Sequence, residues 1–105
     1  MSKKTKFTTG DKIHNCVRLN RDSMMNIAKL GVEKPTAFKV FMFICQNMDA
    51  NNALCVSMKA LGEALGFSRT TLSRTVKYLK ENGWLCIRKL GTLNVYIINP
   101  EIIWK

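Results

Sequence analysis

Between residues 68 and 77 the chain gathers arginine, lysine, serine and threonine at a spacing that suits contact with a nucleic acid. Leu72, Val76 and Leu79 recur at intervals of four and three residues, which predicts a helix with one apolar stripe. Because successive helical residues turn by about 100°, the other polar and cationic side chains point away from this stripe or lie at the exposed N-terminal end. They are Ser68, Arg69, Thr70, Thr71, Ser73, Arg74 and Lys77.

These residue types have the chemistry needed to recognise duplex DNA. An arginine fork matches guanine O6 and N7, threonine can contact a base edge or a thymine methyl, and the hydroxyls of Ser68 and Ser73 can bind phosphates. The alternative is an ordinary solvated helix face, which would be preferred if the helix stood alone. The segments on either side of it favour a recognition helix in the major groove.

A short helix and a tight turn are predicted just before the recognition helix. Ser57 is placed to cap the short helix, Leu61 lies on its inward face, and Gly66 ends it. Gly62 and Gly66 supply the small residue and turn glycine typical of helix-turn-helix units, and Phe67 is placed to fill the corner.

A β-hairpin is predicted after the recognition helix. Residues 84–89 and 93–98 are rich in β-branched and aromatic residues and flank a glycine turn. Arg88 and Lys89 lie near its tip, where a wing commonly meets the phosphate backbone. Alternate hairpin residues are expected to pack inward: Leu85, Ile87, Val95 and Ile97. The predicted fold class is mainly α (α+β), a winged helix-turn-helix with a C-terminal β-hairpin wing.

Trp84 and Tyr96 of this hairpin have two interpretations, stacking on bases or packing in the core, and strand aromatics more often pack. Charge also concentrates here: from Arg69 to Lys89 there are six basic residues and one acid, a local charge of +5. Recognition helix and wing are therefore expected to form one continuous cationic face.

The N-terminal part is predicted to hold a flexible basic arm over residues 1–10, followed by a single domain over residues 11–105. Weak alternation suggests a short strand from Lys12 to Leu19. Asp22 or Ser23 can then cap a helix that runs to about Leu30, with Gly31 as its stop; its predicted role is packing.

A longer helix is predicted from Pro35, which suits a first turn, to about Met48. It is apolar nearly all round, so it is either central in one core or part of a subunit interface. Both interpretations stay open, and the second supports a homodimer. Residues 49–52 have a turn composition, and a brief strand is predicted over residues 53–56.

The overall composition is that of a folded basic protein. The 105 residues carry a formal charge of +10 while 47 % are hydrophobic, which points to a polyanionic partner or to a protein that is merely basic.

The four cysteines form no C-x-x-C pair and His14 is the only histidine, so no structural zinc is expected. The thiols are expected to be reduced and buried. With no signal segment or long apolar run, the protein is expected to be cytoplasmic, with no membrane partner.

The sequence offers no constellation for catalysis. It contains no G-x-x-x-x-G-K-[ST] phosphate loop, and its seven acids are scattered rather than paired. Tyr78 or Tyr96 could attack DNA only with an activating group that the sequence does not supply. We therefore expect a binding protein, not an enzyme, with no cofactor and no metal. A winged helix that binds only another protein is disfavoured by the basic face.

Four segments together resemble the RepL family of plasmid replication proteins, and the resemblance spans roughly residues 22–103. The segments are Met48–Asn52, Gly66–Arg74, Leu79–Asn82 and, above all, Val95–Ile103. The resemblance implies a winged-helix protein that recognises plasmid origin DNA and supports replication initiation or copy control. The DNA-facing residues that it implies are Ser68, Arg69, Thr70, Thr71, Arg74 and Lys77.

The expected partner is double-stranded DNA carrying origin or operator repeats, bound by a homodimer, because paired modules bind two half-sites about one helical turn apart. Host replication proteins are a further candidate class of partner. The alternative function is a transcriptional repressor that binds its operator as a dimer, because origin recognition and repression need the same surface.

Overall fold

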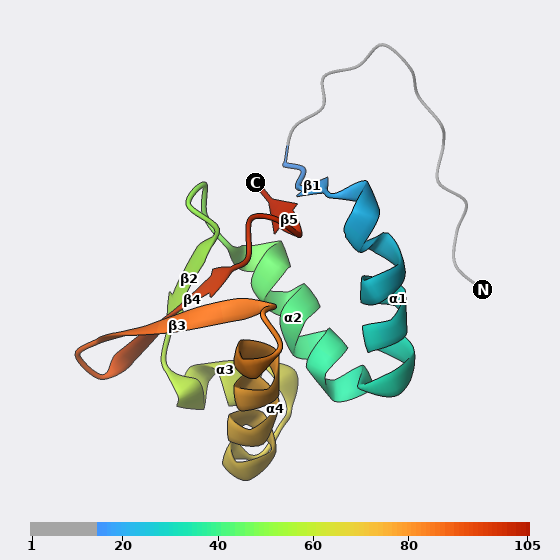
Figure 1. Ribbon diagram of the computed structural model, residues 1–105. Coiled ribbons are helices and arrows are strands. Elements are labelled where there is room, and N and C mark those ends of the chain that lie inside the picture. The colour runs from blue at the N-terminus through green and yellow to red at the C-terminus, as the bar shows by residue number, and fades with distance from the viewer. Residues whose placement is uncertain (1–14) are drawn as a thin grey trace, which may run out of the picture.

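The computed structural model describes residues 15–105, so the predicted arm over residues 1–10, His14 and the first part of the predicted strand at residues 12–19 lie outside the described residues. The predicted elements follow one another in the expected order, and the structure adds a 3-10 turn, η1, and a last strand, β5, that were not predicted (Figure 1). The helices are η1 (Arg21–Ser23, a 3-10 turn), α1 (Met24–Glu33), α2 (Pro35–Asn47), α3 (Met58–Leu65) and α4 (Arg69–Glu81). The strands are β1 (Arg18–Leu19), β2 (Ala53–Val56), β3 (Leu85–Leu90), β4 (Leu93–Ile98) and β5 (Ile103–Trp104).

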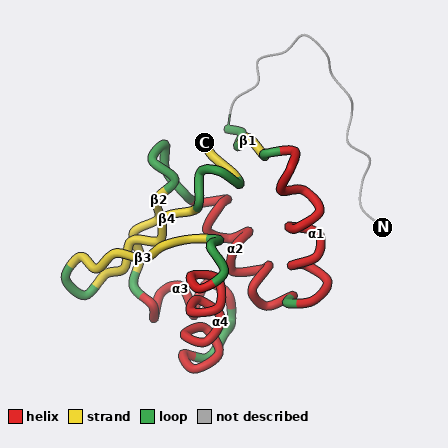
Figure 2. Tube along the Cα trace, in the orientation of Figure 1, coloured by secondary structure: helices red, strands yellow, loops and turns green. Residues whose placement is uncertain are grey.

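Two small antiparallel sheets accompany the helices. The larger has the strand order β2-β4-β3, and the smaller pairs β1 with β5. Figure 2 shows the larger sheet beside the helices, with α2 between that sheet and α1. The α3–α4 pair followed by the β3–β4 hairpin gives an α+β, winged-helix-like fold, which confirms the predicted class.

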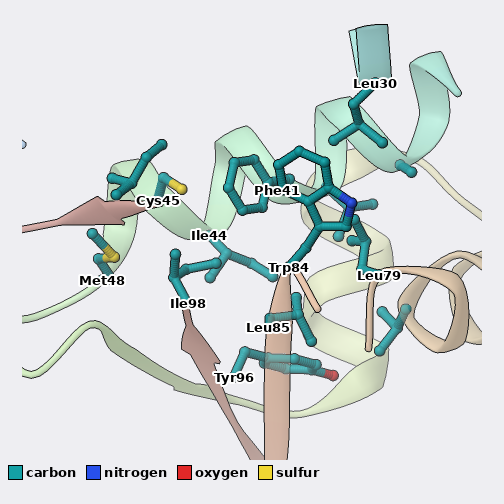
Figure 3. Close-up of a cluster of buried hydrophobic side chains, with 14 of the residues drawn as sticks. Leu30, Phe41, Ile44, Cys45, Met48, Leu79, Trp84, Leu85, Tyr96 and Ile98 are labelled. Carbon is teal, nitrogen blue, oxygen red and sulfur yellow. The ribbon is translucent and has the colours of Figure 1, made fainter. Parts of the chain in front are cut away.

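Helix α2 lies at the centre of the core (Figure 3). Val40, Phe41 and Ile44 have no exposed surface and form one buried face of the helix. Three further apolar residues of the helix are partly buried against the same core: Phe38, Met42 and Phe43. Trp84 packs edge-on against Phe41 with ring centroids 5.1 Å apart, and Tyr96 is also fully buried. Both aromatic residues are therefore core residues and do not stack on bases. The apolar surface of α2 that suggested a subunit interface is largely consumed by this core.

Helix α1 runs past Gly31, which was wrongly predicted to stop it. The helix ends at Glu33 because Lys34 precedes Pro35, and a residue before proline is pushed out of the helical conformation. Gly31 lies within the helix, where a Cβ atom would be in ordinary contact with the ring of Phe38 at 3.5 Å.

The hairpin buries a different set of β4 residues from the one predicted. Ile87 pairs with Tyr96, and Asn94, Tyr96 and Ile98 are buried, so they share the inward face with Leu85. Val95 and Ile97 lie on the other face and are only half-buried. Each strand alternates in the expected way. The prediction was wrong for Val95 and Ile97 because the pairing register of the hairpin decides which alternate set of β4 residues faces inward.

The cysteines also differ from their predicted burial. Cys45 is buried in α2, but Cys16, Cys55 and Cys86 are exposed. Cys55 pairs with Val95 and Cys86 with Ile97, so both thiols lie on the outward sheet face. Only Cys45 behaves as the small core hydrophobe that was expected, and burial raises the pKa of its thiol to about 12.

Asn52 joins segments that lie far apart in the sequence. Its side-chain Nδ2 donates to the carbonyls of Ile98 (3.1 Å) and Ile103 (2.7 Å), and its Oδ1 accepts from the Lys105 backbone N–H (3.1 Å). The residue is 5 % exposed and has a φ of 62°. The turn after α2 is thereby tied to the end of β4 and to β5.

Candidate nucleic-acid interface

Close backbone contact sets the geometry of the turn between α3 and α4. Gly66 adopts a φ of 75°, a left-handed conformation that glycine accepts readily, and its N–H donates to the carbonyl of Gly62 (2.8 Å). A Cβ atom on Gly62 would lie only 3.1 Å from the carbonyl oxygen of Phe67. Both glycines therefore have the roles that the helix-turn-helix spacing predicted.

Each of these helices begins at a serine cap, which was predicted for Ser57, whereas Ser68 was predicted only as the start of its helix. The Ser57 hydroxyl accepts from the N–H of Ala60 (3.0 Å), and the Ser68 hydroxyl accepts from the N–H of Thr71 (3.2 Å). Ser68 also donates to the hydroxyl of Thr71 (3.0 Å). Since the two hydroxyls are joined in this way, Ser68 and Thr71 stabilise the start of α4, a role that the sequence reasoning did not give them.

The opposite faces of α4 have opposite character. Leu72, Val76 and Leu79 are buried, as their spacing predicted. Five of the predicted site residues are exposed and line one shallow surface: Arg69, Thr70, Ser73, Arg74 and Lys77. Within residues 15–105, none of these five side chains makes a hydrogen bond or ion pair. No side chain of the described residues therefore bonds to the polar groups of this α4 surface, which leaves them available to a ligand.

The two cationic residues of the wing, Arg88 and Lys89, lie on opposite faces of the hairpin. The hairpin register pairs Arg88 with Val95 on the outward face, whereas Lys89 pairs with Asn94 on the inward one. Both residues are exposed near the two-residue turn, where Gly91 has a φ of 64°. The expected single face made by recognition helix and wing can therefore include one of these side chains at its centre, but not both.

Two lysines that the sequence reasoning did not single out lie beside α4. Lys34 places its Nζ atom 5.2 Å from the ring centroid of Tyr78, and Lys39 places its Nζ atom 5.7 Å from that of Phe67. They belong to the α1–α2 junction and to α2, more than 25 residues before the recognition helix. No local spacing pattern signals that proximity.

Other reactive groups lie away from this surface. Burial raises the pKa of Tyr96 against the opposing effect of the hydrogen bond from Asn94, and its hydroxyl donates to the sulfur of Met58 (3.8 Å). In the described part of the chain, no three His, Cys, Asp or Glu side chains cluster as metal ligands would. Nor does any helix within residues 15–105 have the length and apolar character needed to cross a membrane.

Comparison with known proteins identifies a family for this chain. A search of curated proteins found no match. A family model described as Firmicute plasmid replication protein (RepL) matches residues 19–105, a range that takes in every helix and the complete β2-β4-β3 sheet. The chain therefore belongs to the RepL family of Firmicute plasmid replication proteins.

Proposed function

We propose that this protein binds duplex DNA sequence-specifically at a plasmid origin, with α4 in the major groove, and thereby initiates replication or controls copy number. The observation that carries the proposal is the α4 surface, where Arg69 and Arg74 stand with two hydroxyl residues and Lys77 on one exposed face. The width of the major groove admits an α-helix, and these side chains can bond to base edges and phosphates. Membership of a plasmid replication family supports the origin as the target.

Binding without chemistry is the proposed molecular activity, and a repressor that binds its own operator is the second candidate. Selecting bound fragments from the source replicon tests both. Recovery of repeated sites inside an origin would support initiation, whereas recovery only across the protein's own promoter would support repression. Cleavage of the fragments, with or without added metal, would contradict a pure binding function.

The wing is proposed to contact the phosphate backbone through Arg88. Replacing Arg88 with alanine should weaken binding to all DNA sequences and reduce the slope of log affinity against log salt by about 0.9, the effect of one lost phosphate contact. Titrations over a range of salt concentrations measure this slope. Lys89→Ala is the matched variant, because Lys89 lies on the opposite face of the hairpin. Affinity of Arg88→Ala equal to the parent at every salt concentration would exclude this contact.

A homodimer is proposed to present two recognition helices to repeated half-sites, and α1 offers the surface for a second copy. Met25 and Val32 are 78 % and 82 % exposed and lie seven residues apart, on the side of α1 opposite to the buried Ile27 and Leu30. When two copies of α1 lie antiparallel, Met25 of one copy can pack on Val32 of the other at both ends of the pair, because the seven-residue spacing is the same in both copies.

On a two-site DNA below saturation, sedimentation of the parent should show free duplex and duplex with two protein chains, with little of the one-chain complex. Met25→Lys/Val32→Lys should populate the one-chain complex, because like charges would meet in the pair and the two sites would fill independently. Only monomers at tens of micromolar, with and without DNA, would remove the homodimer proposal.

A further inference from the structure

We infer that Lys34 and Lys39 form a second phosphate-binding flank beside α4, on the side away from the wing. The inference rests on the proposed function, since it extends the α4 surface to the DNA backbone. It adds residues that come from a different helix and that no spacing pattern connects with the recognition helix.

Lys34 lies in a cleft shared with the middle of α4. The cleft has a volume of about 290 Å³. Its floor and walls include the apolar groups of Pro35, Ala37 and Tyr78, and its polar lining comes from Lys34 and Thr36 on one side and from Arg74 and Thr75 of α4 on the other. Glu33 at the rim contributes the one carboxylate of the lining and makes no ion pair within residues 15–105. With two cations against one acid, the cleft has a net positive charge suited to a phosphate.

Arg74 connects this cleft to the proposed base-reading surface. It lines both the cleft beside Lys34 and the shallow α4 surface with Arg69 and Lys77. Arg74 is therefore shared by the exposed face of α4 and the cleft that Lys34 lines.

Lys39 extends the same flank toward the start of α4. Its ammonium lies over Phe67, the residue in the turn between α3 and α4, while that of Lys34 lies over Tyr78. Phe67 and Tyr78 are eleven residues apart, which corresponds to roughly 16 Å along a helix. The two ammonium groups therefore lie beside opposite ends of α4 and can contact different phosphates along the same side of the groove.

Figure 1 shows the β3–β4 hairpin and the α1–α2 junction on opposite sides of α4. A helix lying in the major groove has a phosphate strand on each side. The wing can then meet one strand while Lys34 and Lys39 meet the other. The aromatic rings beneath the two ammonium groups hold them at the surface of the protein and leave their N–H donors available.

Salt titrations of the double variant Lys34→Ala/Lys39→Ala test this assignment. Binding to every DNA sequence should weaken, and the slope of log affinity against log salt should fall by about 1.8, or about 0.9 for each contact. The ratio of parent to variant affinity should consequently shrink about tenfold between about 50 and 200 mM salt. Lys34→Arg/Lys39→Arg should keep the parental slope, because it keeps both charges.

Lys105→Ala is the matched control for loss of charge. Lys105 is exposed beside Gln46 near the C-terminal end of α2, remote from the α1–α2 junction, and its hydrogen bond to Asn52 uses only the backbone. Its variant should bind as the parent does. An unchanged slope in the double variant, or an equal fall per charge in Lys105→Ala, would overturn the flank.

The same titrations separate this inference from the proposed function. If the parent prefers no DNA sequence and Arg74→Ala has no effect, the proposed function fails. If the parent binds specifically but the double variant matches it, only the flank fails. Neutral methylphosphonates placed at single phosphates should weaken the parent but not the double variant at two positions on the strand that this flank faces; equal weakening of both proteins at every position would also overturn the assignment.

Discussion

Replacing Asn52 with alanine is expected to lower the free energy of unfolding by about 3–4 kcal/mol, from three lost hydrogen bonds of about 1 kcal/mol each and about 1 kcal/mol for an alanine in the left-handed region. The Asn52 side chain bonds to Ile98, Ile103 and Lys105, and it is buried. Its loss leaves the carbonyls of Ile98 and Ile103 without that donor in a site that water reaches poorly.

Urea unfolding of matched variants measures this effect. Asn52→Gly also loses the three side-chain bonds but accepts the φ of 62°, so it should be about 1 kcal/mol more stable than Asn52→Ala. Asn51→Ala is the control: its side chain is exposed, and its backbone N–H, which donates to Asp49, is retained. A midpoint for Asn52→Ala equal to that of Asn51→Ala would show that the junction contributes nothing to stability.

Arg74→Ala is expected to cost about 1–3 kcal/mol of binding free energy on cognate DNA and clearly less on random DNA, as for an arginine that bonds to a guanine. Arg74 is exposed at the middle of α4, where the α4 surface meets the cleft beside Lys34. Arg69→Ala should behave in the same way at the start of the helix. Fluorescence anisotropy with the selected site and with a scrambled duplex measures both losses.

Lys80→Ala provides a matched control on the same helix. Lys80 is exposed in the last turn of α4 and does not line the α4 surface, so its removal should change binding to both duplexes only slightly. Equal losses for Arg74→Ala on cognate and scrambled DNA would mean that Arg74 contacts phosphate alone. Unfolding midpoints that match the parent would exclude an indirect effect through stability.

The helix-turn-helix was predictable because its signals are local. Ser57 and Ser68 cap the next turn of chain, Gly66 supplies a left-handed residue, and Leu72 lies on a stripe whose period is that of the helix itself. Each of these depends on neighbours within a few residues. The exposed character of Arg74 follows from the same period.

Predictions that required a partner from elsewhere in the chain were less successful. The alternation of β4 was recognised, but which set faces inward depends on its register with β2 and β3, so Val95 and Ile97 were assigned to the wrong face. Gly31 was wrongly taken for a helix stop, because a glycine can remain inside a helix and Pro35 sets the end of α1. Cys55 and Cys86 were wrongly expected to be buried, because strand faces are decided by the sheet.

The sequence by itself determined the helix-turn-helix, its outward cations and the RepL resemblance, since these rest on periodicity, caps and short segments. Only the tertiary structure decided that the resembling segments around Asn52 and Ile103 meet through one buried amide. It likewise decided that Lys34 lies beside Tyr78. The physical reason is that both contacts join residues more than 40 positions apart, and the packing of α2 at the centre of the core, not any local spacing, brings such residues together.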